Sequence, residues 1–276
     1  MTVSVQTNTS AMIALQNLNT TEKNLQNVQQ VISTGLMVSS AKDNASVYSI
    51  AQGQRADLNG LTAVTESLNR ASSIADVSLA AGQSVSDLLN QLREKVVGAM
   101  DTSIDTTSRN ALSGDYKALL GQISHVVENA SFNGTNLLNG SLSKAIQFIA
   151  NSDANSTITL SARTISLGGP IITLTANSSL TTATLAGTIL TQLDTSISNL
   201  NANLGALGSQ AKQIQGHLSF VAKLQDSITS GIGNLVDADM AKESSKLQAL
   251  QVQQQLGTQS LSIANQAPQS ILSLFK

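Results

Sequence analysis

The chain of 276 residues contains no cysteine and no tryptophan, only two prolines, and few aromatic or charged residues. The absence of cysteine excludes disulfide bonds, thiol catalysis and cysteine-ligated metal sites. Charged residues are 12% of the chain, about half the usual share, and the net charge of -2 gives no footprint for nucleic-acid binding. So few charges favour a subunit that buries its surface against copies of itself. The alternative is a neutral surface rich in Ser, Thr, Asn and Gln.

Signals for membrane passage are also missing. The first twelve residues have neither a basic region nor an apolar core, and the first basic residue is Lys23, so we expect no cleaved signal peptide. No apolar run approaches the ~20 residues that cross a bilayer, so we expect no membrane insertion. The protein therefore either stays in the cytosol or is exported by a pathway that recognises a different signal.

What the chain does have is a long apolar stripe over residues 190–235. Apolar side chains recur there every three or four residues, and only Gln225 interrupts them. A repeat near 3.5 residues held for this length is typical of coiled coils and long bundles, and the helix would be roughly 70 Å long. The stripe consists of Leu190, Leu193, Ile197, Leu200, Leu204, Leu207, Ala211, Ile214, Leu218, Val221, Gln225, Ile228, Ile232 and Leu235.

A second stripe lies in the first half of the chain. Its centre is made of small residues, which suits the close approach of a neighbouring helix. Because each helix alone would expose its stripe to water, the two most simply pair with each other. The second stripe consists of Leu61, Val64, Leu68, Ala71, Ala75, Ser78, Gly82, Val85, Leu89, Leu92, Val96 and Ala99.

Three shorter segments also show helical spacing of apolar residues. The first covers residues 11–36 and has a glycine near its end as a stop signal. The second runs through 112–126 and is closed by the turn dipeptide Asn133-Gly134. The third covers 238–264 and has a glutamine-rich centre. Residues 39–55 are small and polar, and predict an irregular connection before the long helix of the second stripe.

Between residues 141 and 187 the pattern changes from helical to alternating. Residues 157–160 and 171–174 alternate apolar and polar side chains on either side of Gly168-Gly169-Pro170, which predicts a β-hairpin. We therefore expect a mainly α protein, a long antiparallel coiled-coil or helical-bundle rod with a small β-hairpin region and paired N- and C-termini.

A search for catalytic and ligand-binding motifs finds little. His125 and His217 lie on predicted helices with no metal-binding pattern, which favours surface or stripe positions over a zinc site. Asp237, Asp239 and Glu243 are close enough in sequence to share a cation, but acidic residues at a helix start more simply cap free N–H groups. We expect no enzyme activity and no cofactor.

Both ends of the chain resemble the bacterial flagellins. Residues 31–46 read VISTGLMVSSAKDNAS and resemble the signature LSSGLRINSAKDDAAG, and the FNGTNLL of 132–138 resembles the family's FNG turn. Residues 236–243, VDADMAKE, are similar to IEDADYATE, and the closing ANQAPQSILSLFK of 264–276 is similar to ANQVPQNVLSLLR. The resemblance covers about 1–140 and 186–276 and leaves only the β-region unmatched.

The resemblance implies a subunit of the flagellar filament, of the short type seen in some alphaproteobacteria and without an outer variable domain. It implies a terminal coiled-coil domain of the filament core, 1–44 with 234–276, a helical domain of 45–140 with 186–233, and a β-hairpin region at 141–185. Flagellin termini are disordered in the monomer and fold on assembly. The assembly residues implied are Leu15, Leu18, Leu25, Val28, Ile32, Leu36, Leu247, Leu250, Leu256, Leu261, Ile271, Leu272, Leu274 and Phe275.

The resemblance also implies partners and a location. These are other flagellin subunits, hook-associated and cap proteins, an export chaperone and the type III flagellar export apparatus, and the destination is the extracellular filament. In flagellins sensed by the vertebrate Toll-like receptor, a segment like LQRVRELAVQ aligns with residues 89–98. Arg93 and Glu94 match, but Gln91 and Lys95 stand where that pattern has arginine and leucine, so we expect weak or absent recognition. The alternative is that Gln91 and Lys95 arose by neutral drift on a helix face.

Many flagellins carry O-linked sugars on outward-facing hydroxyls, and the candidates here are Ser178, Ser179, Thr181, Thr182 and Thr184. The alternative is that such residues simply suit exposed turns. Three other functions compete with the filament subunit. A hook-filament junction protein shares flagellin-like ends, an enzyme on a flagellin scaffold would need a catalytic insertion, and a coiled-coil adaptor would form a small oligomer that never polymerises.

Overall fold

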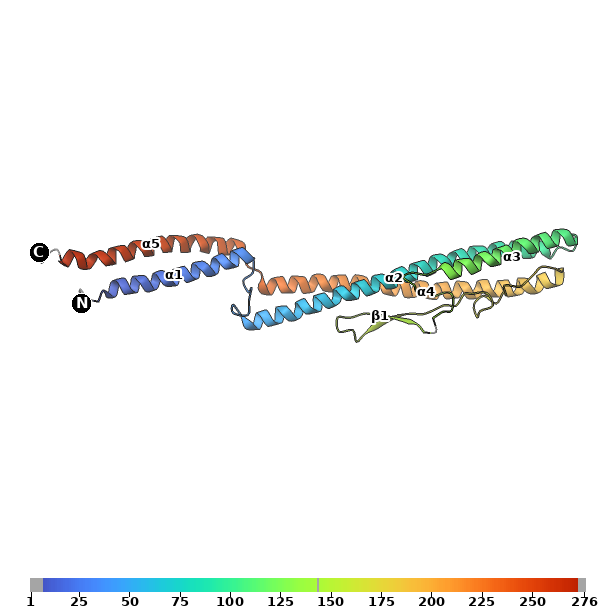
Figure 1. The fold of residues 1–276 in the computed structure, drawn as a ribbon, viewed down its shortest axis with the longest axis horizontal. Helices are drawn as coiled ribbons and strands as arrows, with labels where there is room; N and C mark the ends of the chain where they lie inside the picture. Colours follow the sequence, from blue (N-terminus) through green and yellow to red (C-terminus); the bar gives the residue numbers. More distant parts are fainter. Residues whose placement is uncertain (1–6, 143, 273–276) are drawn as a thin grey trace. The chain divides into compact units, whose positions relative to one another are not determined.

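The computed structural model describes residues 7–142 and 144–272, with the backbone alone for 267–272, and within them the fold is mainly helical, as predicted (Figure 1). The chain divides into two units, Met1–Ala56 with Ser227–Lys276 (unit 1) and Asp57–Asp226 (unit 2). No helix in the described ranges is both long and apolar enough to span a bilayer. The elements are α1 (Thr9–Thr34), α2 (Ala45–Ala99), α3 (Thr106–Asn129), β1 (Ile146–Ile149), β2 (Thr157–Leu160), α4 (Ala183–Val236) and α5 (Met240–Leu272).

Unit 1 is built on an antiparallel pair of helices, α1 and α5, which lie side by side in Figure 1. The Asn8 side chain caps α1 by accepting from the Ala11 N–H, and it also donates to the Ala264 carbonyl at 2.7 Å. At the other end, Gly35 adopts φ 72° and ends the helix with a left-handed cap, as its stop signal predicted. The N- and C-terminal helices are therefore paired, as expected.

A small apolar cluster closes unit 1 where the chain leaves α1. Val38, Ala51, Ile232 and Val236 are its buried members. Backbone bonds fix the crossing segments, because the Met37 N–H donates to the Val236 carbonyl at 2.7 Å. The cluster lies beside the start of α2 and the end of α4.

The start of α2 corrects one prediction. Residues 39–55 were expected to be irregular, but the helix begins at Ala45. The Asn44 side chain accepts from the Val47 N–H at 3.2 Å and acts as an N-terminal cap. This capping asparagine was a sequence signal for the helix start, and the small residues around it obscured the signal.

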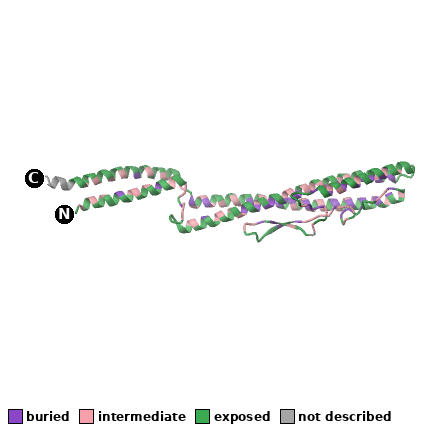
Figure 2. Ribbon diagram, viewed as in Figure 1, coloured by how far each residue is buried: buried purple, intermediate pink, exposed green. Residues whose placement is uncertain are grey.

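Unit 2 is organised around the stripe of α2, which is confirmed at every position. All twelve residues from Leu61 to Ala99 in that stripe are buried, and no member of the α4 stripe is fully exposed. Figure 2 shows the buried positions running along both helices. The small centre has the predicted role, because a Cβ atom at Gly82 would overlap the Leu204 side chain of α4.

The β-hairpin exists, but its predicted strands are only half correct. β2 pairs with β1, an antiparallel partner that was not predicted, in a register that joins Phe148 to Ile158. Residues 171–174 are not a strand. Ile172 and Leu174 are buried, and the Leu174 carbonyl accepts from the Gly168 N–H at 2.7 Å. Ile171 is buried as well, so adjacent side chains of this segment are buried without a β-ladder.

The hairpin is tied to the helices of unit 2 by side chains. The Ser67 hydroxyl of α2 accepts from the Ile149 N–H at 3.3 Å, and Gln210 of α4 accepts from the Ser161 N–H at 3.3 Å. His217 of α4 lies 2.7 Å from the Ala150 carbonyl. The hairpin therefore lies on the helices of unit 2.

Candidate assembly surface

The predicted assembly residues whose side chains the structure describes fall into three classes of exposure. Leu18, Val28 and Leu250 are buried between α1 and α5, whereas Leu15 and Leu256 are exposed. Five others, Leu25, Ile32, Leu36, Leu247 and Leu261, are half-buried. The side chains of Ile271 and Leu272, and the whole of Leu274 and Phe275, lie outside the described residues.

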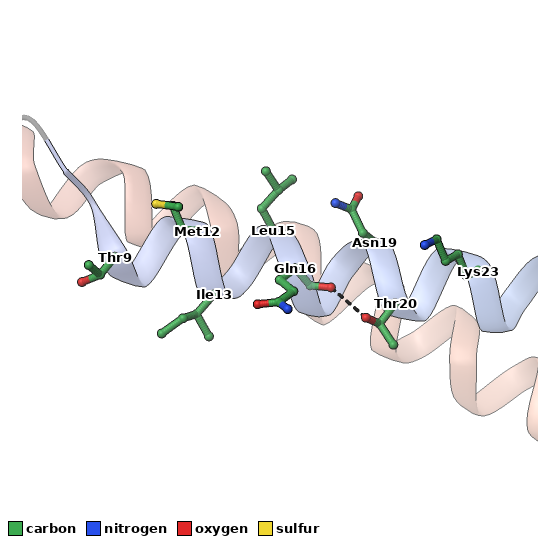
Figure 3. Close-up of a pocket in the computed structure, with 8 residues that line it drawn as sticks. All are labelled: Thr9, Met12, Ile13, Leu15, Gln16, Asn19, Thr20 and Lys23. Atoms are coloured by element: carbon green, nitrogen blue, oxygen red, sulfur yellow. Dashed lines mark hydrogen bonds between the residues drawn. The ribbon is translucent and has the colours of Figure 1, made fainter.

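Two exposed apolar side chains of α1 were not selected from the sequence. Met12 is 66% exposed, and Ile13 is almost as accessible. Figure 3 shows Met12, Leu15, Asn19 and Lys23 on one side of the helix, while Ile13 points to another side. These residues line a shallow hollow together with Thr9, Gln16 and Thr20. The sequence signal that was missed is that Met12, Ile13 and Leu15 together make an apolar surface wider than one helical stripe.

The helix α5 carries a comparable set of exposed apolar residues. Leu256 is 61% exposed, and Val252 and Ile263 are similarly accessible. We call Met12, Ile13, Leu15, Val252, Leu256 and Ile263 the unit 1 apolar surface. Large exposed apolar side chains gathered in one unit are typical of surfaces that bind other proteins.

The segment between α1 and α2 is held by one carboxylate. Oδ2 of Asp43 accepts from the backbone N–H and the hydroxyl of both Ser39 and Ser40, at 2.9 to 3.1 Å. These bonds, first that from the Ser40 N–H, hold the pKa of Asp43 below its ordinary value. The Ser-Ala-Lys-Asp segment in the flagellin-like signature is thus a hydrogen-bonded loop.

The four residues compared with the receptor-recognition segment lie on α2. Gln91, Arg93 and Glu94 are exposed, and Lys95 is half-buried. Arg93 Nε lies 2.9 Å from Asp194 Oδ1 on α4. Lys95 Nζ lies 3.1 Å from Asp115 Oδ2 on α3. Both cations are therefore engaged within unit 2.

The five candidate glycosylation residues differ in the access to their hydroxyls. Ser178 and Ser179 are half-buried, and the Ser178 hydroxyl donates to the Thr175 carbonyl at 2.8 Å. Thr182 is exposed, but its hydroxyl accepts from the Leu185 N–H at 3.2 Å at the start of α4. Thr181 and Thr184 are exposed.

The two histidines and the acidic residues near the start of α5 each have a position that the structure defines. His125 is exposed on α3, and His217 is half-buried beside the hairpin. Asp239 caps α5, because its Oδ1 accepts from the N–H groups of Ala241 and Lys242. Capping was the expected role of the acidic residues near this helix start.

Comparison with known proteins finds matches at both ends of the chain. Residues 5–143 match the bacterial flagellin N-terminal helical region and residues 190–275 match the C-terminal helical region. Flagellin FljJ of Caulobacter vibrioides is 51% identical over 280 residues, covering 100% of this chain and 99% of the relative. A flagellin of Brucella melitensis is 38% identical, covering 99% of both chains. The crystal structure of Bacillus cereus flagellin is similar with a TM-score of 0.50 at 25% identity, covering 56% of this chain and 88% of that one.

Proposed function

Since the chain belongs to the bacterial flagellin family, whose members are the structural subunits of the flagellar filament, we propose that it polymerises through the unit 1 apolar surface. The observation that supports this is the exposure of Met12, Ile13 and Leu256 on helices whose facing sides are already paired. Burying one such side chain contributes about 1.5–3 kcal/mol. Six of them in every copy supply a strong drive for self-association.

The proposal assigns a separate role to each part of the chain. The terminal domain, 1–44 with 234–276, forms the filament core, and the helical domain, 45–140 with 186–233, surrounds it. The β-hairpin region at 141–185 faces outward, and no outer variable domain is needed. The buried stripes of unit 2 support this division, because that unit can fold around its own core.

The wider setting follows from the same proposal. The subunit reaches the extracellular filament through the type III export apparatus. An export chaperone and the hook-associated and cap proteins are its further partners. Its role is structural and not catalytic, and it needs no cofactor.

Seeded polymerisation tests the proposal directly. Purified full-length chain is added to short filament seeds and examined by negative-stain electron microscopy, beside variants that lack residues 1–36 or 238–276. We expect long uniform filaments from the full chain and none from either truncation. Discrete particles from the full chain would contradict the proposal and favour a junction protein or an adaptor.

We propose in addition that this chain activates the vertebrate Toll-like flagellin receptor weakly. The ion pairs of Arg93 and Lys95 support this, because a cation already paired within unit 2 must leave its partner before it can bind another protein. A receptor reporter assay with purified monomer should give little signal at doses at which a recognised flagellin saturates. Full activation would overturn the proposal.

For O-linked modification, the accessible hydroxyls support Thr181 and Thr184 over Ser178, Ser179 and Thr182. Peptide mass spectrometry on protein from its native cell should find added mass on the peptide with the first two residues. Substitution of both by alanine should remove it, whereas Ser178→Ala should not. An intact mass equal to that of the sequence would rule out the modification.

A further inference from the structure

Methionine is the only sulfur-containing residue of this chain, and in the described part of the chain it is never buried. The sequence has five methionines and no cysteine. Met12, Met37, Met100 and Met240 are all exposed, although methionine is ordinarily among the residues most often found in protein cores. Any oxidant that reacts with thioethers therefore meets these surface sulfurs first.

Met12 is the most accessible of the four. Its side chain is 66% exposed, against 37% for Met100. Figure 3 shows its sulfur on the outer side of α1, on the same side as Leu15. The Met100 methyl group lies against Gly187 of α4, so part of that side chain is already packed within unit 2. Met12 can therefore be compared with Met100, because Met12 belongs to the unit 1 apolar surface and Met100 does not.

We propose that Met12 is a site of reversible oxidation at which peroxides block self-assembly. The inference rests on the proposed function, because it needs Met12 to be covered by another copy. A peroxide transfers one oxygen atom to Sδ of Met12. The O–O bond breaks and an S–O bond forms, the thioether is oxidised to a sulfoxide, and the hydroperoxide is reduced to water or the corresponding alcohol.

The sulfoxide changes what Met12 can do in an interface. A flexible apolar side chain becomes polar, and a polar oxygen buried without a hydrogen-bond donor destabilises the contact. Of the residues that Figure 3 shows on the same side of α1, Leu15 lies about one turn from Met12 and carries no donor in its side chain. Asn19 and Lys23, which do carry donors, lie about two and three turns away. Oxidation of the free subunit therefore weakens its addition to a filament, while a subunit already covered by its neighbours is protected.

Controlled oxidation of the full-length chain tests this inference. Monomer is treated with hydrogen peroxide, the Met12 peptide is quantified by mass spectrometry, and elongation of seeds is measured over a range of concentrations. We expect the critical concentration to rise about ten-fold or more, which corresponds to losing the burial of one methionine. Methionine sulfoxide reductases should restore elongation, and assembled filaments should show slower oxidation of Met12 than monomers.

Three variants identify the residue responsible. Met12→Leu keeps an apolar side chain of similar volume. Peroxide should leave the critical concentration of this variant at the value that the untreated variant shows. Met100→Leu is the matched control and should stay sensitive. Met12→Gln should raise the critical concentration without any oxidant.

The outcomes separate this inference from the proposed function. Equal inhibition of the wild-type chain and Met12→Leu by peroxide would overturn the role of Met12, as would complete oxidation of Met12 with unchanged elongation. Failure of the untreated chain to elongate seeds would contradict the assembly premise itself, and this inference would fall with it.

Discussion

The two units of this chain use the same kind of helix and bury it to very different extents. In unit 2, Leu68, Leu89 and Leu92 of α2 are fully buried. In unit 1, Leu256 of α5 and Met12 of α1 remain mostly exposed. Two paired helices can cover only one face of each other, whereas unit 2 also has α3 and the hairpin region as covering layers. The difference supports the proposal that unit 2 folds around its own core and that further copies complete the core of unit 1.

The largest expected effect comes from truncating a buried leucine of unit 2. Leu89→Ala should lower the free energy of unfolding by about 2–5 kcal/mol, because it leaves a cavity between helices. The matched change in unit 1, Leu256→Ala, should alter monomer stability by less than about 0.5 kcal/mol while it weakens seeded polymerisation. Denaturant unfolding of both monomers measures the contrast, and equal losses would contradict it.

A smaller effect is expected from a buried hydroxyl of unit 2. Ser113 of α3 is buried, and its hydroxyl accepts from the buried Leu180 N–H at 3.0 Å. Ser113→Ala should cost about 1–3 kcal/mol, because the amide is left without its partner. The control is Ser84→Ala, a change at an exposed position of α2, which should cost much less. If thermal unfolding finds the two variants alike, Ser113 does not hold the segment before α4.

The helices and their buried faces could be predicted from the sequence, because they depend on the spacing of apolar residues. Contacts between segments far apart in the sequence could not. The stripe from Leu61 to Ala99 could be identified because helical spacing selects one face whatever that face packs against. The β1–β2 pairing could not be identified, because 171–174 is as rich in apolar and β-branched residues as 157–160, and such a short segment can be a strand or a packed loop. Within the candidate site, the terminal stripes were predicted, but not the exposure of Met12 and Ile13 or the partner of Arg93, which lies 101 positions away.

The ion pair between Arg93 and Asp194 should contribute less than about 1 kcal/mol, because both side chains are half exposed. A double-mutant cycle with Arg93→Ala and Asp194→Ala measures the coupling. We expect it to shrink further at high salt. A coupling of several kcal/mol would mean that exposed charges, and not the buried stripes, hold α2 to α4.

The smallest expected effect concerns Asp43 and pH. The pKa of Asp43 is lowered in the folded state, so its stabilising effect is present above the ordinary value of 3.8 and is lost as the pH falls through the lowered pKa. Asp43→Asn should therefore reduce the steepness with which unit 1 loses structure below about pH 4. Hydrogen exchange in the segment from Ser39 to Asn44 measures this, and identical pH profiles would exclude the carboxylate as the cause.

Hydrogen exchange of the full-length chain as monomer and as filament tests the central claim most directly. We predict that in the monomer the amides of α1 and α5 exchange much faster than those of α2 and α4 within unit 2. In the filament, the amides of α1 and α5 should become as protected as those of unit 2. Equal protection of both units in the monomer would contradict the claim that unit 1 is completed only by other copies.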